Sequence, residues 1–325
     1  MKLITKIICK MNIEYIMRYI EKYNEKLYSI EFDWIVAAVC KTKDEYYIYN
    51  FVKNKNILSR LSKYNIDDLT KAIRETGSPL YIFLFARDVV NISPDNINDL
   101  TKAICETNNA EFMYNFATDV RKLNIYNKND LANKICETKD AKYIYLFAKN
   151  VKNLSRCAIN NLTRAICETK DSCYIYQFAI DVKKLNKGNK IDLTKAICQT
   201  NSVEYIYKFA RNVENLVPNN IYDLTKAMCK TKDAEYMYLF SKNVKNLGRK
   251  SKRLLRKTIL RTNNTEYICK YAIYIDNSII FGKFGTIEKF CIFISKSNID
   301  SQAKGNMLND IISPKRLVYG NYDFN

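Results

Sequence analysis

The sequence predicts an all-α fold, a right-handed α-solenoid of about 8–10 stacked αα-hairpin repeats with degenerate terminal caps. The main observation is a threonine that recurs first after 34 residues and then every 31 residues, at Thr42, Thr76, Thr107, Thr138, Thr169, Thr200, Thr231 and Thr262. Each interval contains the start signals of two helices. The 325 residues include only 7 Gly and 4 Pro, too few for a loop-rich or disordered chain.

The first helix of each repeat is predicted to begin at an asparagine. Asn96 is followed three residues later by Asp99, a pair that resembles a capping box. Leu100, Ala103 and Ile104 then fall at helical spacing and form an apolar stripe that ends near the threonine. The pair recurs as Asn65 with Asp68, Asn127 with Asp130, Asn189 with Asp192, and Asn220 with Asp223.

The second helix of each repeat is predicted to begin two residues after the threonine. The residue there is always a favoured N-cap, namely Asp44, Ser78, Asn109, Asp140, Asp171, Ser202, Asp233 or Asn264. In one repeat Pro79 follows, which suits the first turn of a helix. We expect the threonine to bond back to a carbonyl one turn earlier or to brace the turn. The predicted buried stripe of this helix is Tyr143, Ile144, Phe147, Ala148 and Val151.

A cysteine column runs two residues before the threonine column, through Cys9, Cys40, Cys105, Cys136, Cys167, Cys198, Cys229 and Cys291. The chain has no His and no CxxC pair, so this spacing does not match a zinc site, and we expect neither a metal nor another cofactor. The favoured interpretation is that reduced cysteines fill small apolar slots on the first helix. Reduced thiols predict a reducing compartment.

One column on the second helix is a candidate binding face. It holds the second aromatic residue of each YIY-type motif, with basic residues four and seven positions later. Packing between repeats is the favoured interpretation of the rings. The alternatives are a groove for a protein, or a ladder that stacks the bases of single-stranded nucleic acid. The residues are Tyr49, Phe83, Arg87, Tyr114, Tyr145, Lys149, Tyr176, Lys183, Tyr207, Arg211, Tyr238 and Lys242.

The charge of the chain favours anionic partners. It has 53 basic and 34 acidic residues, a net charge of +19. A second basic line follows the first helices through Lys71, Lys102, Arg164, Lys195, Lys226 and Lys257. The absence of His removes the usual general base of enzymes. No apolar stretch reaches the roughly 18 residues of a membrane span, so we expect no membrane partner and a cytoplasmic location, in the host cell if the protein is viral.

The repeats predict one continuous solenoid over residues 1–294 and a polar cap or tail over 295–325. The 34-residue interval indicates a three-residue insertion, which we place in the stretch KNKNILSRLSKYN after the second helix of its repeat. Gly282 and Gly285 interrupt the pattern shortly before the predicted tail, as expected of a degenerate terminal repeat.

The repeated phrase, most complete between Asp99 and Val244, reads DLTKAICETKDAEYIYLFAKNV in consensus. It resembles the tandem αα-repeats of uncharacterised proteins from giant DNA viruses, phages and AT-rich bacteria. The resemblance covers most of the chain and implies an α-solenoid, but it brings no activity or site residues. Tetratricopeptide and HEAT repeats are similar in layout, and most of their members bind peptides or proteins.

These observations predict a non-enzymatic interaction scaffold that binds a protein or peptide along an extended face of the solenoid. The alternative is a nucleic-acid-binding solenoid that uses the Tyr/Lys ladder. A third hypothesis is an enzyme of the helical-repeat DNA glycosylase type, but the repeated columns offer no unique catalytic residue. The sequence does not predict the oligomeric state.

Overall fold

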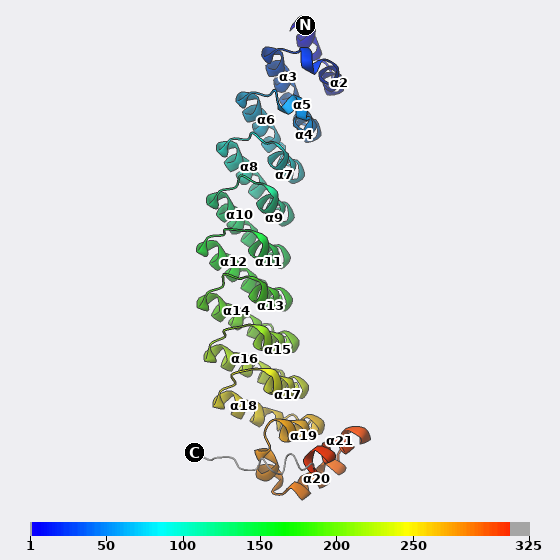
Figure 1. Ribbon diagram of the computed structural model, residues 1–325, viewed down its shortest axis with the longest axis vertical. Helices are drawn as coiled ribbons and strands as arrows, with labels where there is room; N and C mark the ends of the chain where they lie inside the picture. Colours follow the sequence, from blue (N-terminus) through cyan, green and yellow to red (C-terminus); the bar gives the residue numbers. More distant parts are fainter. Residues whose placement is uncertain (1, 313–325) are drawn as a thin grey trace. The chain divides into compact units, whose positions relative to one another are not determined.

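The computed structural model describes residues 2–312 and contains no strand among them. Its helices form two compact units, Met1–Thr169 and Lys170–Asn325. In each unit, pairs of antiparallel helices stack on one another in chain order (Figure 1). The predicted all-α helical-repeat solenoid is therefore confirmed.

The first unit begins with α1 (Lys2–Ile8), α2 (Ile13–Tyr23) and the short η1 (Asn24–Lys26). We call the first helix of each later repeat an A helix and the second a B helix. The A helices are α3 (Ser29–Lys41), α6 (Lys63–Glu75), α8 (Pro94–Glu106), α10 (Ile125–Glu137) and α12 (Arg156–Thr169). The B helices are α4 (Glu45–Lys53), α7 (Pro79–Asp88), α9 (Ala110–Asp119) and α11 (Ala141–Asn150), and α5 (Lys55–Leu58) follows α4.

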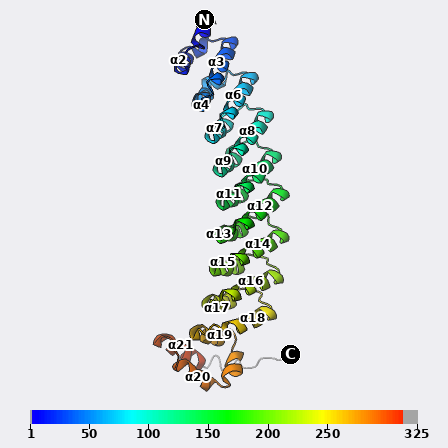
Figure 2. The same cartoon turned by 180° about the vertical axis from the view of Figure 1, so that it is seen from behind.

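The second unit continues the alternation with its own rows. Its A helices are α14 (Lys187–Gln199), α16 (Pro218–Thr231) and α18 (Arg249–Ile259), and its B helices are α13 (Ser172–Asp181), α15 (Val203–Asn212), α17 (Ala234–Asn243) and α19 (Thr265–Tyr274). It ends with η2 (Ile280–Phe284), α20 (Ile287–Ser295) and α21 (Ser301–Ile312). Within each unit, A helices pack on neighbouring A helices and B helices on neighbouring B helices, as the view from behind also shows (Figure 2).

The threonine column stabilises the turn from each A helix to its B helix. The Thr138 hydroxyl donates to the Ile135 carbonyl oxygen at 2.7 Å and accepts the Asp140 N–H at 3.3 Å. Lys139 between them has a φ of 56°. Asp140 then caps α11 by accepting the Tyr143 N–H at 3.1 Å. The predicted turn and the predicted starts of the B helices are confirmed.

The predicted start of the A helices was wrong by three residues. Helix α8 begins at Pro94 after the N-cap Ser93, and the Ser93 hydroxyl accepts the Asn96 N–H at 3.2 Å. Asn96 is therefore the third helical residue and not the cap. Its side chain is buried and donates to Asp67 of the preceding A helix at 2.7 Å. Asn65 and Asn127 make the same kind of contact, with Asp33 and Asn98 respectively, so the asparagine column links successive A helices.

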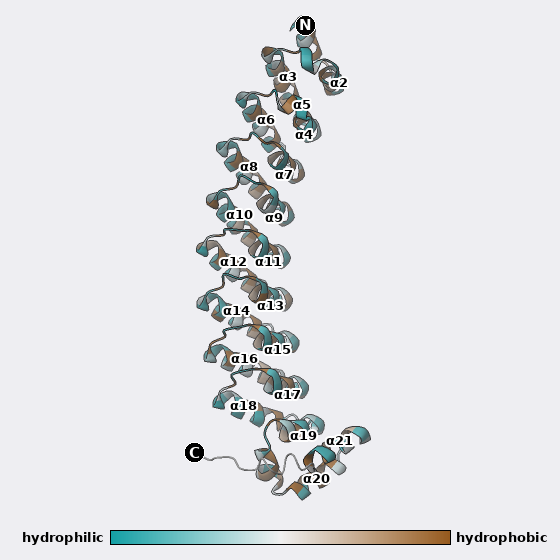
Figure 3. Ribbon diagram, viewed as in Figure 1, coloured by the Kyte–Doolittle hydropathy of each residue, from teal (hydrophilic) through white to brown (hydrophobic). Residues whose placement is uncertain are grey.

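The core lies between the two rows of helices in each unit. Every B helix buries an aromatic residue there, which is Tyr271 in α19 and otherwise a phenylalanine, at Phe51, Phe85, Phe116, Phe147, Phe178, Phe209 and Phe240. The predicted A-helix stripe of Leu100, Ala103 and Ile104 is also buried. Polar residues face outward on the same helices (Figure 3). Tyr143 was wrongly assigned to the buried stripe of its helix, because the structure leaves it half-exposed.

The repeat pattern changes in the last part of the second unit. Gly285, with a φ of 82°, ends the irregular turn η2 and leads into α20. Helix α21 packs on α19 and α20 and buries Met307 and Ile311. The polar segment predicted to begin at residue 295 thus contains a packed helix, and its residues 313–325 lie outside the described part of the chain.

Candidate binding face

The candidate aromatic column lies on the B helices, where most of its rings are buried. Tyr49, Phe83, Tyr145, Tyr207 and Tyr238 are each only 6–8% exposed, whereas Tyr114 and Tyr176 are half-buried. A buried ring cannot stack on a base unless the repeats separate. The packing interpretation accounts for these rings.

Within each unit, rings of the column pack against the first aromatic residue of the next B helix. The ring centroids of Tyr49 and Tyr81 are 5.8 Å apart, and those of Tyr114 and Tyr143 are 6.1 Å apart. In the second unit the same contact joins Tyr176 with Tyr205, Tyr207 with Tyr236, and Tyr238 with Tyr267. Tilted and edge-on contacts at these separations are favourable beyond the apolar area they bury.

The tyrosine hydroxyls form a second series of contacts between repeats. The Tyr49 hydroxyl donates to Asp88 Oδ2 on the next B helix at 2.6 Å. Asn150 Nδ2 donates to the Tyr114 hydroxyl, Asn212 Nδ2 to that of Tyr176, and Asn243 Nδ2 to that of Tyr207, at 2.7–2.8 Å. We call this series the hydroxyl ladder. Phe83 has no hydroxyl, so the ladder lacks a contact from α7 to Asp119, the corresponding residue of α9.

The basic residues of the candidate face are exposed. Lys53 lies over the Tyr49 ring at 5.8 Å, and Arg87 lies over the Phe83 ring at 5.2 Å. The same contact recurs between Lys149 and Tyr145, Arg211 and Tyr207, and Lys242 and Tyr238, at 5.3, 6.0 and 5.7 Å. Lys183 is also exposed but lies beyond the end of α13. A partner that approaches this face would therefore contact the exposed basic side chains, which lie over the mostly buried rings. We call this row of basic side chains the cationic edge.

A cleft interrupts this edge in the first unit. It has a volume of about 880 Å³ and lies where the carboxyl ends of α4, α7 and α9 meet the loops that follow. Its basic lining residues are Lys53, Lys55, Arg87, Arg121 and Lys122, and its acidic ones are Asp88 and Asp119. Leu58 and Val90 line it with apolar surface, and Val90 is 68% exposed.

The acidic residues of the cleft are already engaged. Arg87 Nε lies 2.7 Å from Asp88 Oδ1, and this contact lowers the pKa of the Asp88 carboxyl, with further lowering from the Tyr49 hydroxyl and Lys53. Burial and the bond to Asp88 raise the pKa of Tyr49 to about 12. Asp119 accepts from the Thr118 hydroxyl at 2.8 Å. The cations of the cleft thus outnumber the carboxylates, which favours an anionic ligand.

The short helix α5 makes this cleft different from its counterpart in the second unit. There a cleft of about 500 Å³ lies beside Arg211, Glu214 and Lys245, with no extra helix. Lys55 and Leu58 belong to α5 and line the larger of these two clefts. Sequence reasoning placed the insertion correctly but missed Lys55 and Lys122 as site residues. The 34-residue interval was the signal that could have found Lys55.

The cysteine column offers no metal site. Within residues 2–312, no three His, Cys, Asp or Glu side chains gather closely enough to hold a metal ion. Most thiols of the column are half-buried, and burial raises the pKa of Cys40, Cys105, Cys136 and Cys198 to about 12. Thiols with such pKa values are poor nucleophiles at neutral pH.

Comparisons with known proteins leave the function to be inferred from this geometry. None of the described helices is long and apolar enough to cross a bilayer. No family model and no curated protein matches the chain. A solved structure described as "Computational Design of Self-Assembling Cyclic Protein Homooligomers" is similar at 14% identity, with 83% of this chain and 98% of that chain covered and a TM-score of 0.13.

Proposed function

We propose that the protein is a non-enzymatic interaction scaffold that binds an acidic peptide segment of a partner protein in the cleft beside α5. The observation that carries this proposal is the lining of the cleft, where five cations surround two engaged carboxylates, the exposed Val90 side chain and the half-buried Leu58 side chain. A peptide with acidic and apolar residues would match both parts of this lining.

The shape of the cleft supports a peptide over a small molecule. The cleft is open along the ends of three successive B helices, and its cations come from α4, α5, α7 and the loop after α9. Small-molecule sites are usually enclosed and mostly apolar, with a few converging polar groups. Cations spread along an open surface suit a ligand that extends across several helices.

The alternative from the sequence, base stacking on the Tyr/Lys ladder, has less support. It requires rings such as Tyr145 and Tyr207, which are 7% and 8% exposed. Substituting them with Ala would remove packing between repeats, so we expect a loss of stability from these variants.

The test is a fluorescence anisotropy titration of the full chain with a labelled peptide of Glu, Asp and Leu. The variant Lys55→Gln with Arg121→Gln removes two exposed cations of the cleft. The control Lys71→Gln with Arg164→Gln removes the same charge from exposed positions on A helices. We expect the cleft variant to weaken binding at least about 10-fold and the control to change it less than about 2-fold.

Two results would contradict the proposal. Equal weakening by the cleft variant and the control would show that only net charge matters. Equal affinity for a peptide of the same charge without Leu would exclude the apolar lining as part of the site. A circular dichroism spectrum of each variant establishes that the helices are retained.

A further inference from the structure

Helix α18 carries a dense run of positive charge that the proposed function does not use. Residues 249–261 contain seven cations and no Asp or Glu. Ser251, Leu255 and Ile259 are buried on the side of the helix that packs on α16 and α17. The cations therefore project from the remaining sides of a helix that is held in place by its apolar residues.

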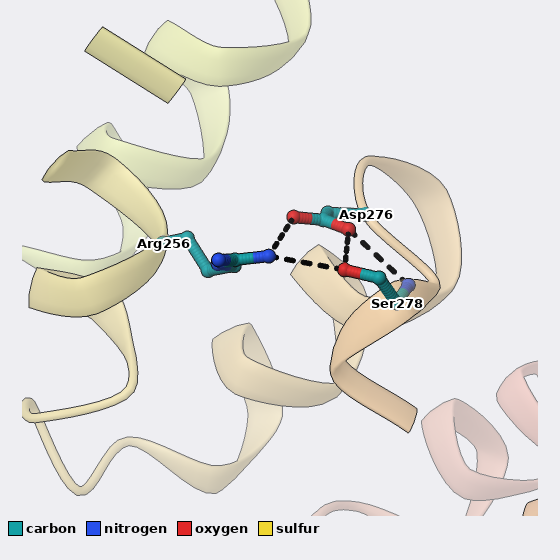
Figure 4. Close-up of polar contacts among 3 residues, drawn as sticks. All are labelled: Arg256, Asp276 and Ser278. Atoms are coloured by element: carbon teal, nitrogen blue, oxygen red, sulfur yellow. Dashed lines mark hydrogen bonds and ion pairs between the residues drawn. The ribbon is translucent and has the colours of Figure 1, made fainter. Parts of the chain in front are cut away.

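One of the seven cations has a structural role. Arg256 Nη1 lies 3.4 Å from Asp276 Oδ2 and donates to the Ser278 hydroxyl at 3.1 Å (Figure 4). These contacts join α18 to the loop after α19. Arg256 is thus engaged by the fold.

Four of the other six cations form an exposed stripe. Lys250, Arg253, Lys257 and Arg261 are exposed and follow one another at intervals of three or four residues. On the neighbouring α16, Lys226 and Lys230 are exposed at the positions equivalent to Lys257 and Arg261. We call these six residues the basic patch. They are Lys226, Lys230, Lys250, Arg253, Lys257 and Arg261.

The basic patch has one acidic and one aromatic neighbour on α16. Asp223 pairs with Lys226 at 2.8 Å, so part of the charge of that lysine is balanced. Tyr222 is half-exposed, and Lys226 Nζ lies 5.0 Å from the centre of its ring. Tyr222 occupies the position of α16 that Arg253 occupies in α18, one repeat later.

We propose that the basic patch binds the phosphate backbone of a single-stranded nucleic acid. Cations three or four residues apart on a helix are separated by about 4.5–6 Å along its axis, which presents a regular row of positive charge to a regular row of phosphates. Arginine can hold a phosphate with two parallel hydrogen bonds. The Tyr222 ring at the edge of the patch adds a surface on which a base can stack.

The surroundings of the patch favour this partner over a membrane or an acidic peptide. Between residues 218 and 261, no large apolar side chain is largely exposed. Insertion into a bilayer surface requires such side chains. Peptide binding usually requires apolar anchors in pockets. A polyanion that is held mainly by its charge needs neither exposed apolar side chains nor apolar pockets.

The inference does not depend on the proposed function, because the basic patch lies in the second unit and the peptide cleft in the first. The test uses the full chain and a fluorescein-labelled oligothymidylate of about 20 nucleotides. The patch variant is Lys250→Gln, Arg253→Gln and Lys257→Gln. The control variant is Lys102→Gln, Arg164→Gln and Lys195→Gln. It also removes two lysines and one arginine, but from exposed positions equivalent to Lys257 in other repeats.

We expect the patch variant to bind at least about 10-fold more weakly at about 50 mM salt, and the control to stay within about 3-fold of the original chain. Loss of three phosphate contacts should also lower the slope of log affinity against log salt by about 2. Tyr222→Ala should weaken binding further without changing this slope, because a stacked base releases no counterion.

Four results would overturn the inference. The first is the absence of saturable binding at low salt, and the second is an equal loss of affinity in the patch and control variants. The third is polyglutamate of similar length competing as well as the oligonucleotide, which would assign the patch to an acidic protein. Binding of anionic vesicles that the patch variant abolishes, while oligonucleotide binding persists, would assign it to a membrane.

Discussion

The hydroxyl ladder predicts opposite effects of two conservative substitutions in neighbouring repeats. Tyr49→Phe removes a hydroxyl that donates to Asp88 at 2.6 Å. Phe83→Tyr adds a hydroxyl at the same position of the next B helix, where Asp119 is the corresponding acceptor. Both changes keep the buried ring, so neither creates a cavity in the packing between repeats. Tyr49→Phe should therefore destabilise the first unit, and Phe83→Tyr should stabilise it.

The geometry sets the expected size of each effect. A hydrogen bond to a charged group contributes about 1.5–3 kcal/mol. The Asp88 side chain is 31% exposed and also pairs with Arg87, so water and Arg87 compensate part of the loss. We therefore expect Tyr49→Phe to cost about 1–2 kcal/mol and Phe83→Tyr to add about 0.5 kcal/mol, since Asp119 is exposed and already accepts from Thr118.

The assay is urea unfolding combined with amide hydrogen exchange of α4, α7 and α9. Exchange resolves the repeats that each substitution affects, whereas a single midpoint averages over the array. Tyr114→Phe is the matched control, because it removes a hydroxyl that accepts a hydrogen bond from the neutral Asn150 side chain, and it should cost less than Tyr49→Phe. Equal stability of the original chain and Tyr49→Phe, within about 0.3 kcal/mol, would refute the role of the ladder.

The Tyr49 hydroxyl and the Asp88 carboxyl also predict how the stability loss from Tyr49→Phe depends on pH. The pKa of Asp88 is lowered in the folded chain, so its contribution is present above the unfolded value of 3.8 and is lost as the pH falls through the folded value. The pKa of Tyr49 is raised from 10.0 to about 12, so its contribution is present below pH 10 and is lost as the pH rises toward 12. The stability difference between the original chain and Tyr49→Phe should therefore be constant from about pH 5 to 9 and shrink outside that range.

Three further substitutions test other columns of the repeat. Asp140→Ala removes the cap of α11 and should cost about 1 kcal/mol in urea unfolding, and an unchanged midpoint would refute the cap. Asn127→Ala leaves Asn98 without its donor and should cost about 1–3 kcal/mol, with faster amide exchange in α8 and α10 as the measurement. Cys157 is exposed, so Cys157→Ser should remove the fastest phase of iodoacetamide labelling, whereas Cys136, whose pKa burial raises to about 12, should label slowly. Labelling of Cys136 as fast as Cys157 would contradict its burial.

Features that depend on neighbouring residues could be predicted from the sequence. The turn at Thr138 and the cap at Asp140 use bonds that span two or three residues, so the residue types alone specify them. The start of the A helices was assigned to Asn96, three residues after the true N-cap Ser93. Asn96 has the short polar side chain that is typical of an N-cap, but this side chain instead forms the buried link to Asp67 of the preceding A helix.

Features that depend on contacts between repeats could not be predicted from one helix. A helical wheel places Tyr143 nearer the centre of the apolar face than Tyr145, yet the structure buries Tyr145 and leaves Tyr143 half-exposed. The reason is that each B helix is covered by the next one along the row, which shifts the buried face sideways. The run of cations in residues 249–261 occurs in one repeat, so the columns that the repeats share do not predict it.

The extra turn α5 has a consequence for how a partner would find its position on the first unit. Repeats that present the same side chains offer a ligand many equivalent sites, so such a ligand would be distributed among them and could exchange from one to the next. The α5 residues Lys55 and Leu58 line the cleft of the first unit, and the corresponding cleft of the second unit has no such helix. A partner that contacts these two residues is held in a single register. The insertion of α5 thereby distinguishes one binding position on a surface that is otherwise periodic.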